Sequence, residues 1–359
     1  MSTHYEERME ADLSEIKRKV RKVSDLVELQ VQRAVEAFLT DTVDLANQAV
    51  LGDRQVNRRI KELDYLCHAF IVRHAPSAGH LRFVSAVLRL AVALERVGDY
   101  AGMMGREVVR LSAPPPGTIR RDIEMMGHHA RHTLSQALRA FHHGDVALAR
   151  ASLGLAEQSD ITLNTVIKEL IATGEKGERS LRDLFALQRI VNLITRVAEQ
   201  AENVAEQTIF ATTGETRDRR VFRVLFIDER NDRSSQIAEA YARKAFPESG
   251  AYKSAGWNPG RALDAKLIDF MDEHGMDLRA SVPKKVQPLA TLPEHYHVIV
   301  SFSPGAREHL GELPYRTTLL EWSLGVGPGT DAPTLEKLYQ ELAVRVQDLM
   351  TTLAGHDAR

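Results

Sequence analysis

The N-terminal part of the chain carries apolar residues at helical spacing. Between residue 5 and about residue 212, apolar positions recur every three to four residues. The first such stripe consists of Leu13, Ile16, Val20, Val23 and Val27. Glycine, proline and polar clusters predict breaks at residues 51–55, 74–80, 112–117, 142–145 and 172–180. The pattern predicts about six helices, several of them long, that pack as a bundle.

This helical region contains an internal repeat. Residues 80–101 and 180–201 align without gaps at an offset of 100, with seven identities in 22 positions. The shared residues include Arg96 and Arg196, which are both followed by valine. The repeat predicts two three-helix units in tandem, at residues 1–112 and 118–214.

Beyond the polar segment 212–220, which we interpret as a linker, the pattern changes. Short apolar runs at 221–227, 297–302 and 317–322 predict strands. Residues 263–274 and 335–351 predict helices. Because strands that alternate with helices form parallel sheets, we expect an α/β domain at 221–359. The expected fold class is thus multidomain: all-α tandem three-helix bundles followed by an α/β domain.

Composition limits the partners, the cellular location and the kinds of cysteine site that the protein can have. The 359 residues have a net charge of -2, so no bulk attraction to nucleic acid is expected. Residues 1–20 are too charged for a signal peptide, and no apolar run approaches the ~18 residues that span a bilayer. Cys67 is the one cysteine, which excludes an internal disulfide framework and a cysteine-rich zinc site. We expect a cytoplasmic protein without direct membrane insertion.

Two segments of the helical region carry a family resemblance. Residues 75–101 read APSAGHLRFVSAVLRLAVALERVGDYA, and residues 193–215 read LITRVAEQAENVAEQTIFATTGE. Over residues 5–215 the chain resembles the PhoU family of phosphate-uptake regulators. The resemblance implies a non-enzymatic negative regulator of phosphate uptake and of phosphate-responsive signalling. The implied partners are the phosphate ABC transporter ATPase or the phosphate-sensing histidine kinase, and a homodimer is implied.

The PhoU resemblance also implies an acidic metal motif on the third helix of each unit. Glu95 and Asp99 match it, and their i, i+4 spacing places both carboxylates on one helix face. In the second unit Thr195 replaces the first acid and Glu199 holds the second position, so a weaker or absent site is expected there. Oxygen ligands suit hard cations, and iron, manganese, magnesium or zinc are the candidates.

Simpler interpretations of these polar residues stay open. Glu95 and Asp99 also fit a solvated face paired with nearby arginines. Another group, Glu124, His128 and His132, repeats at i, i+4, i+8 and could chelate a metal, but a polar helix surface is the preferred interpretation. We interpret His142 and His143 as capping or surface residues, and Cys67 as a buried inert thiol.

The C-terminal region resembles the low-molecular-weight protein tyrosine phosphatases and arsenate reductases. The resemblance rests on residues 224–246, on 252–286 with a strand ending in SAG, and on 295–302. That family has a phosphate loop of a cysteine, five residues, an arginine and a serine. The cysteine attacks phosphorus as a thiolate and the arginine clamps the phosphoryl oxygens.

The loop of this chain departs from the family pattern. Asp228 stands at the cysteine position and Ser234 at the arginine position. Arg233 comes one residue too early, which is ~100° of rotation at the start of a helix. Asn231 and Ser235 keep their family positions. No cysteine follows residue 67, so the resemblance implies a pseudophosphatase.

The charges of the loop also indicate that phosphatase activity has been lost. Residues 228–235 hold three acids and two arginines, which disfavours tight phosphate binding. We expect Asp228 to accept the N–H groups of the loop where a phosphate lies in active relatives. Asp331 matches the family's general acid, but it has no thiol to serve. The alternative is an active phosphatase or arsenate reductase that uses a mechanism without cysteine, with Asp228 as the nucleophile.

Overall fold

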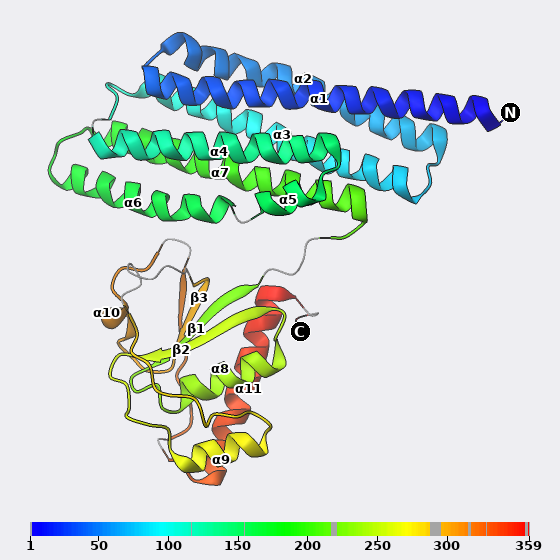
Figure 1. Ribbon diagram of the computed structural model, residues 1–359. Coiled ribbons are helices and arrows are strands. Elements are labelled where there is room, and N and C mark those ends of the chain that lie inside the picture. Colours follow the sequence, from blue (N-terminus) through cyan, green and yellow to red (C-terminus); the bar gives the residue numbers. More distant parts are fainter. Residues whose placement is uncertain are drawn as a thin grey trace. The chain divides into compact units, whose positions relative to one another are not determined.

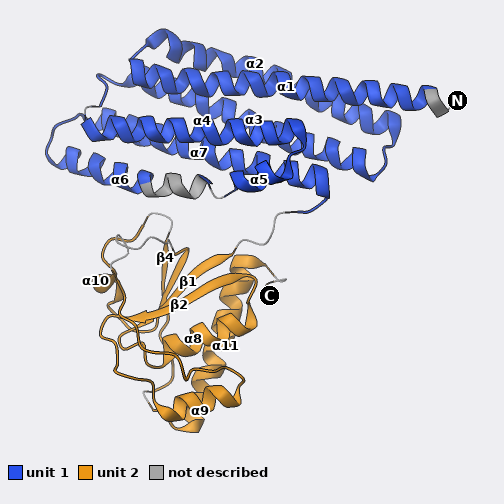
Figure 2. Cartoon of the chain, in the orientation of Figure 1, with its two compact units in different colours: residues 1–217 blue, residues 218–359 orange. Residues whose placement is uncertain are grey.

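The chain forms two compact units, Met1–Arg217 and Asp218–Arg359, which Figure 2 shows in different colours. The computed structural model describes residues 2–115, 117–153, 155–216, 221–287, 296–314, 317–327, 329–355 and 358, without the side chains of residues 2–3 and 156–161. Each unit is described by itself.

The first unit is helical in its described residues (Figure 1). Its helices are α1 (Ser2–Thr40), α2 (Val43–His74), α3 (Ala78–Arg110), α4 (Gly117–His143), α5 (Val146–Ser152), α6 (Leu155–Glu175) and α7 (Leu181–Thr213). The long helices lie alongside one another, as expected for a bundle. Among the described helices, none combines the length and the apolar character that a membrane crossing requires.

Two details of the helix boundaries correct the sequence prediction. The break expected at 51–55 is wrong, because α2 runs through it. Gly52 does not end the helix: a Cβ there would lie 2.0 Å from Nε2 of the buried Gln30, so glycine permits close packing of α1 against α2. The chain instead turns at Asp41, in the left-handed region with φ 53°. An interruption that was not expected separates α5 from α6.

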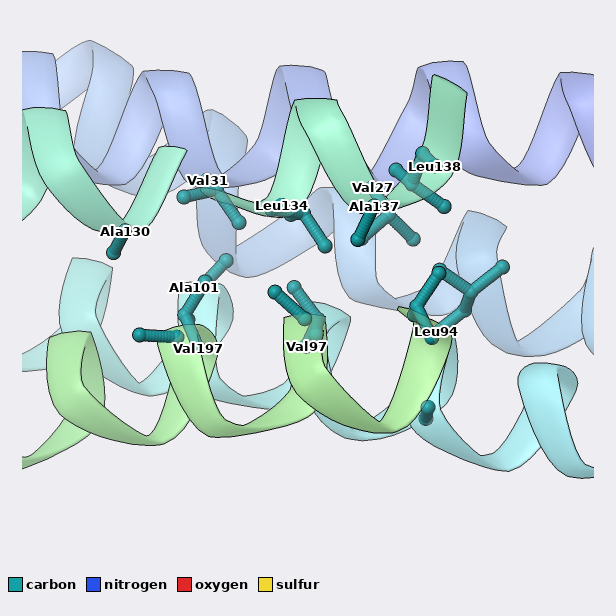
Figure 3. Close-up of a cluster of buried hydrophobic side chains, with 14 of the residues drawn as sticks. Val27, Val31, Leu94, Val97, Ala101, Ala130, Leu134, Ala137, Leu138 and Val197 are labelled. Carbon is teal, nitrogen blue, oxygen red and sulfur yellow. The ribbon is translucent and has the colours of Figure 1, made fainter. Parts of the chain in front are cut away.

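The two predicted repeats share one hydrophobic core (Figure 3). The matching segments lie on α3 and α7, which are both 33 residues long. Figure 3 shows side chains of both helices, among them Val97 and Val197, close to Leu134 of α4. The stripe predicted on α1 is buried throughout, and Val27 has no exposed surface. Residues 1–112 and 118–214 therefore lie within one compact unit.

The second unit contains a four-stranded sheet in which every described pairing is parallel. Its elements are β1 (Phe222–Asp228), α8 (Ser234–Ala245), β2 (Gly250–Gly256), α9 (Ala265–Glu273), β3 (Val298–Ser301), α10 (Ala306–Leu310), β4 (Thr318–Glu321) and α11 (Ala332–Ala354). The strand order is β2-β1-β3-β4. The predicted strands and helices of this region are confirmed, and β2 is the strand that ends in SAG.

Alternation along β1 distributes its side chains between two cores. Val224 and Phe226 pack with residues of α8, α9 and α11 on one face of the sheet. Leu225 and Ile227 pack with α10 on the other face. Both faces are covered, as is usual for a parallel sheet. The loop after β1 therefore leaves the carboxyl end of a central strand, where α/β proteins commonly place their sites.

Candidate functional site

The loop between β1 and α8 is held in a tight conformation by its backbone. Asn231 adopts φ 49°, a left-handed conformation that asparagine tolerates better than most residues. The loop also packs directly on Gly256 at the end of β2. A Cβ on Gly256 would lie 2.7 Å from the Glu229 carbonyl oxygen and 2.8 Å from the Asn231 nitrogen. Glycine at this position allows the close approach of the two segments.

The carboxylate of Asp228 accepts hydrogen bonds from the loop that follows it. Oδ2 accepts from the Ser235 backbone N–H at 2.9 Å, and Oδ1 accepts from the Asn231 backbone N–H. Asp228 is only 8% exposed. Burial raises the pKa of this carboxyl, and the hydrogen bonds from Ser235 and Asn231 counteract part of that effect. The expectation that Asp228 accepts N–H groups of the loop is confirmed.

Asn231 connects the loop to its surroundings. Its Nδ2 donates to Ser235 Oγ at 2.8 Å, and its Oδ1 accepts from the Lys284 backbone N–H at 2.7 Å. Gln236 Nε2 donates to the same Oδ1 at 3.1 Å. Asn231 and Ser235 are fully buried and Ser234 is nearly so. The sequence had indicated Asn231, Ser234 and Ser235, but neither Gln236 nor Lys284.

The guanidinium of Arg233 is engaged away from the loop backbone. Its Nη1 donates to the carbonyl oxygens of Gly327 and Gly329, at 2.9 Å each. Arg233 thereby connects the loop after β1 to the glycine-rich segment between β4 and α11. These contacts direct Nη1 of Arg233 to the segment between β4 and α11 and not to the backbone of its own loop.

The other acids of the loop lie at its outer side. Glu229 is exposed, and Asp232 is partly buried. Asp232 Oδ2 accepts from Arg230 Nε at 2.7 Å. These two acids therefore do not share the backbone N–H groups that bind Asp228.

Asp331, which matches the general acid of the family, caps a helix. It is the N-cap residue of α11, and its Oδ2 accepts from Thr334 Oγ1 at 3.0 Å. The hydrogen bond from Thr334 lowers the pKa of this carboxyl, so it is ionised at neutral pH. A group that donates a proton to a leaving oxygen needs a raised pKa, so this environment does not favour that role.

The candidate metal residues lie on α3 and α7. Asp99 is close to Asp53 of α2, and burial together with the Asp53 and Glu95 carboxylates raises its pKa to about 6. Glu199 lies 3.9 Å from Arg196, and buried Thr195 donates to the backbone of its own helix. The described residues contain no group of three or more histidine, cysteine or acidic side chains arranged to hold a metal ion. Metal binding at Glu95, Asp99 and Glu199 stays a prediction.

The remaining candidates have ordinary surroundings. Glu124 and His128 form an exposed pair at 3.8 Å. Cys67 is buried, and burial raises its pKa to about 12, so its thiol is not a nucleophile at neutral pH. His143 is exposed, whereas His142 is partly buried and lines a cavity that is described below.

Comparison with known proteins assigns the helical unit. The PhoU domain model matches residues 20–108 and 123–208. The helical unit is a tandem PhoU domain. The PhoU homologue of Pseudomonas putida, a phosphate-specific transport system accessory protein, is 26% identical over 217 residues, which cover 60% of this chain and 84% of the relative. The solved PhoU of Pseudomonas aeruginosa is 25% identical, covers 57% of this chain and 99% of its own, and has a TM-score of 0.55.

The α/β unit that follows the tandem PhoU domain has its own structural relatives. A solved arsenate reductase in the phosphate binding state is 21% identical, with a TM-score of 0.32. The match covers 37% of this chain and 99% of that chain. The unit has a fold that resembles low-molecular-weight phosphatases and arsenate reductases.

Proposed function

We propose that the protein is an accessory regulator of phosphate transport that lowers phosphate uptake and phosphate-responsive two-component signalling. The tandem PhoU domain is the observation that carries this proposal. Its relatives in P. putida and Escherichia coli are phosphate-specific transport system accessory proteins. The partner that fits this role is the transporter ATPase or the phosphate-sensing histidine kinase. In this proposal the protein acts in the cytoplasm as a homodimer.

The α/β unit fits the role of a catalytically inactive sensor or docking module. Support comes from the Asp228 carboxylate, which takes the loop N–H groups that a phosphoryl group would need. Further support comes from Arg233, which is bound to Gly327 and Gly329. The missing thiol removes the nucleophile of the family reaction.

Deletion of the gene tests the regulatory role. Without the protein, phosphate uptake and expression of phosphate-starvation genes should rise in phosphate-rich medium. A copy that encodes residues 1–359 should restore both to the starting level. Uptake and expression that do not respond to deletion would contradict the proposal.

Hydrolysis of an aryl phosphate by the purified full chain tests the inactive assignment. We expect no turnover above that of a matched sample of Asp228→Ala. Turnover in the starting protein that disappears in Asp228→Ala would establish the enzymatic alternative, in which Asp228 is the nucleophile.

Glu95 and Asp99 are proposed ligands of a hard cation, with Glu199 as a further candidate. Elemental analysis of the purified protein, compared with Glu95→Ala and Asp99→Ala, tests this assignment. We expect bound metal that is lost in the variants. A metal content that is equal in all three proteins would rule these residues out.

A further inference from the structure

The tandem PhoU domain contains a cavity of about 540 Å³ that no motif of the sequence indicated. It lies where the beginning of α3 and the ends of α4 and α7 meet the first half of α1. The lining residues that matter for a ligand are Lys17, Arg21, Phe83, Phe141, His142 and Thr212. The volume is within the ~300–1,000 Å³ that is usual for small-molecule sites.

The charge of the lining is entirely of one sign. It holds three cationic side chains and two histidines but no carboxylate, although the chain as a whole has a net charge of -2. Arg18 is neutralised by Glu15 at 2.5 Å. Among the described residues, no carboxylate forms an ion pair with Lys17 or Arg21. Two cations are therefore available to an anion at the mouth of the cavity.

Aromatic rings form part of the wall. Phe83 of α3 and Phe141 of α4 stack with ring centroids 6.0 Å apart and an interplanar angle of 28°. Lys17 Nζ lies 5.7 Å from the centroid of Phe83. A cation next to an aromatic surface can contact a charged group and a flat ring of the same ligand.

The polar groups near the rings favour a ligand that carries hydroxyls. Thr208 Oγ1 donates to the Val204 carbonyl at 3.1 Å, and Thr212 Oγ1 donates to the Thr208 carbonyl at 2.9 Å. Because both hydroxyl protons are used, a ligand can only donate to these oxygens, and of the two residues Thr212 is exposed whereas Thr208 is buried. Burial and the charge of Arg21 lower the pKa of His142 and outweigh the opposing effect of the Asp25 carboxylate, so the imidazole is neutral at pH 7.

We propose that this cavity binds a mononucleotide, with the phosphate between Lys17 and Arg21 and the base against Phe83 and Phe141. A ribose hydroxyl then donates to Thr212 Oγ1. The cavity belongs to the helical unit and shares no residue with the loop at Asp228. The assignment goes beyond the regulatory role and does not depend on it.

Calorimetric titration of the full chain tests the proposal, with adenosine 5′-monophosphate, adenosine and orthophosphate as separate probes. We expect the monophosphate to bind at least about tenfold more tightly than either of the other two, because only it reaches both the cations and the rings. Orthophosphate that binds as tightly as the monophosphate, or adenosine that does so, would overturn the assignment.

Substitutions then place the binding in this cavity. Lys17→Ala and Arg21→Ala should each weaken binding of the monophosphate about tenfold or more, since each removes a charge-assisted contact. Phe83→Leu should weaken it while it keeps the wall apolar. Lys22→Ala is the matched control, because Lys22 is an exposed lysine on the same helix that does not line the cavity.

The expected results also define failure. Binding that is equally affected by Lys22→Ala and Arg21→Ala would reflect general charge attraction and would overturn the site. Binding that survives both Lys17→Ala and Arg21→Ala would place the ligand elsewhere. The absence of any binding by the monophosphate at millimolar concentration would overturn the proposal outright. Lys17 and Arg21 are exposed, so these variants are expected to fold.

Discussion

At the scale of single residues, Asp228 supports the loop that follows β1. Its two carboxylate oxygens bind backbone N–H groups four residues apart, at Asn231 and Ser235. A buried carboxylate is costly without such partners, and buried N–H groups are costly without an acceptor. The Asp228 carboxylate and the two backbone N–H groups therefore stabilise one another.

Asp228→Ala should lower the free energy of unfolding by about 1–3 kcal/mol, because it leaves two buried N–H groups unsatisfied. Relief from burying a charge offsets part of that loss. Millimolar orthophosphate should raise the Tm of Asp228→Ala but not that of the starting protein, since phosphate can then accept the free N–H groups. Thermal unfolding with and without phosphate measures this. An equal rise in both proteins would contradict it, and Asp232→Ala is the control.

Arg233→Ala should release the segment that contains Gly327 and Gly329. Loss of two hydrogen bonds from a charged donor should increase amide hydrogen exchange in residues 324–330. Arg230→Ala is the control, because Arg230 is exposed and pairs only with Asp232 in this loop. Exchange that is equally fast in both variants would show that Arg233 does not hold the segment.

At the scale of elements, close helix packing in the PhoU domain depends on glycines within helices. A Cβ on Gly105 of α3 would lie 2.5 Å from the Ala46 carbonyl oxygen of α2, whereas one on Gly79 of the same helix would meet no atom within 4 Å. Such glycines look like breaks in a sequence, as Gly52 did. Periodicity therefore predicted the helices well, but it could not distinguish a glycine that ends a helix from one that admits a neighbour.

These two glycines give opposite predictions. Gly105→Ala should destabilise the helical unit by ~1–3 kcal/mol through overpacking, although alanine has the higher helix propensity. Gly79→Ala should be neutral or stabilising by up to ~1 kcal/mol. Chemical denaturation measures both, and a stabilising Gly105→Ala would contradict the packing.

The start of α7 is tied to the segment after α3 by Asp183. This buried carboxylate accepts hydrogen bonds from the Ser112 backbone N–H at 3.0 Å and from the Ser112 hydroxyl. Ser180, the N-cap residue of α7, accepts from the Asp183 backbone N–H at 3.1 Å. Burial alone would raise its pKa, but the hydrogen bonds from Ser112 outweigh burial and lower it from its ordinary value of 3.8. The lowered pKa means that the ionised carboxylate stabilises the fold above pH 3.8.

Asp183→Asn should therefore lower the free energy of unfolding by about 1–2 kcal/mol at pH 7. The difference from the starting protein should shrink as the pH falls below 3.8, where the native carboxylate becomes protonated. Unfolding curves between pH 3 and pH 7 measure this. If the difference in unfolding free energy between the two proteins did not change with pH, the loss would come from the altered packing of the amide and not from the missing charge.

At the scale of the whole molecule, the two units have separate hydrophobic cores. We expect calorimetric unfolding to show two transitions. Gly105→Ala should shift only the transition of the helical unit, and Asp228→Ala only that of the α/β unit. One transition that both variants shift equally would show that the units unfold together.

The sequence predicted the order of these units, the parallel sheet and the place of the loop, because periodicity and motif spacing are local properties. It also predicted that Asp228 would accept N–H groups of the loop, because the identity of the residue at position 228 is enough to supply the acceptor. It did not reveal the contacts of Arg233 with Gly327 and Gly329 or the cavity around Lys17. Those features join residues far apart in the chain, and only packing brings them together.

The position of Asp228 also affects how the loop responds to its surroundings. The Asp228 carboxylate is covalently part of the loop, so its effective concentration at the loop N–H groups is high and it cannot diffuse away. Free phosphate would have to displace it, and so the shape of the loop should not follow the phosphate level in the cell. Any information that the α/β unit passes to the PhoU domain would then come through its outer surface, and through protein contacts in place of oxyanion binding.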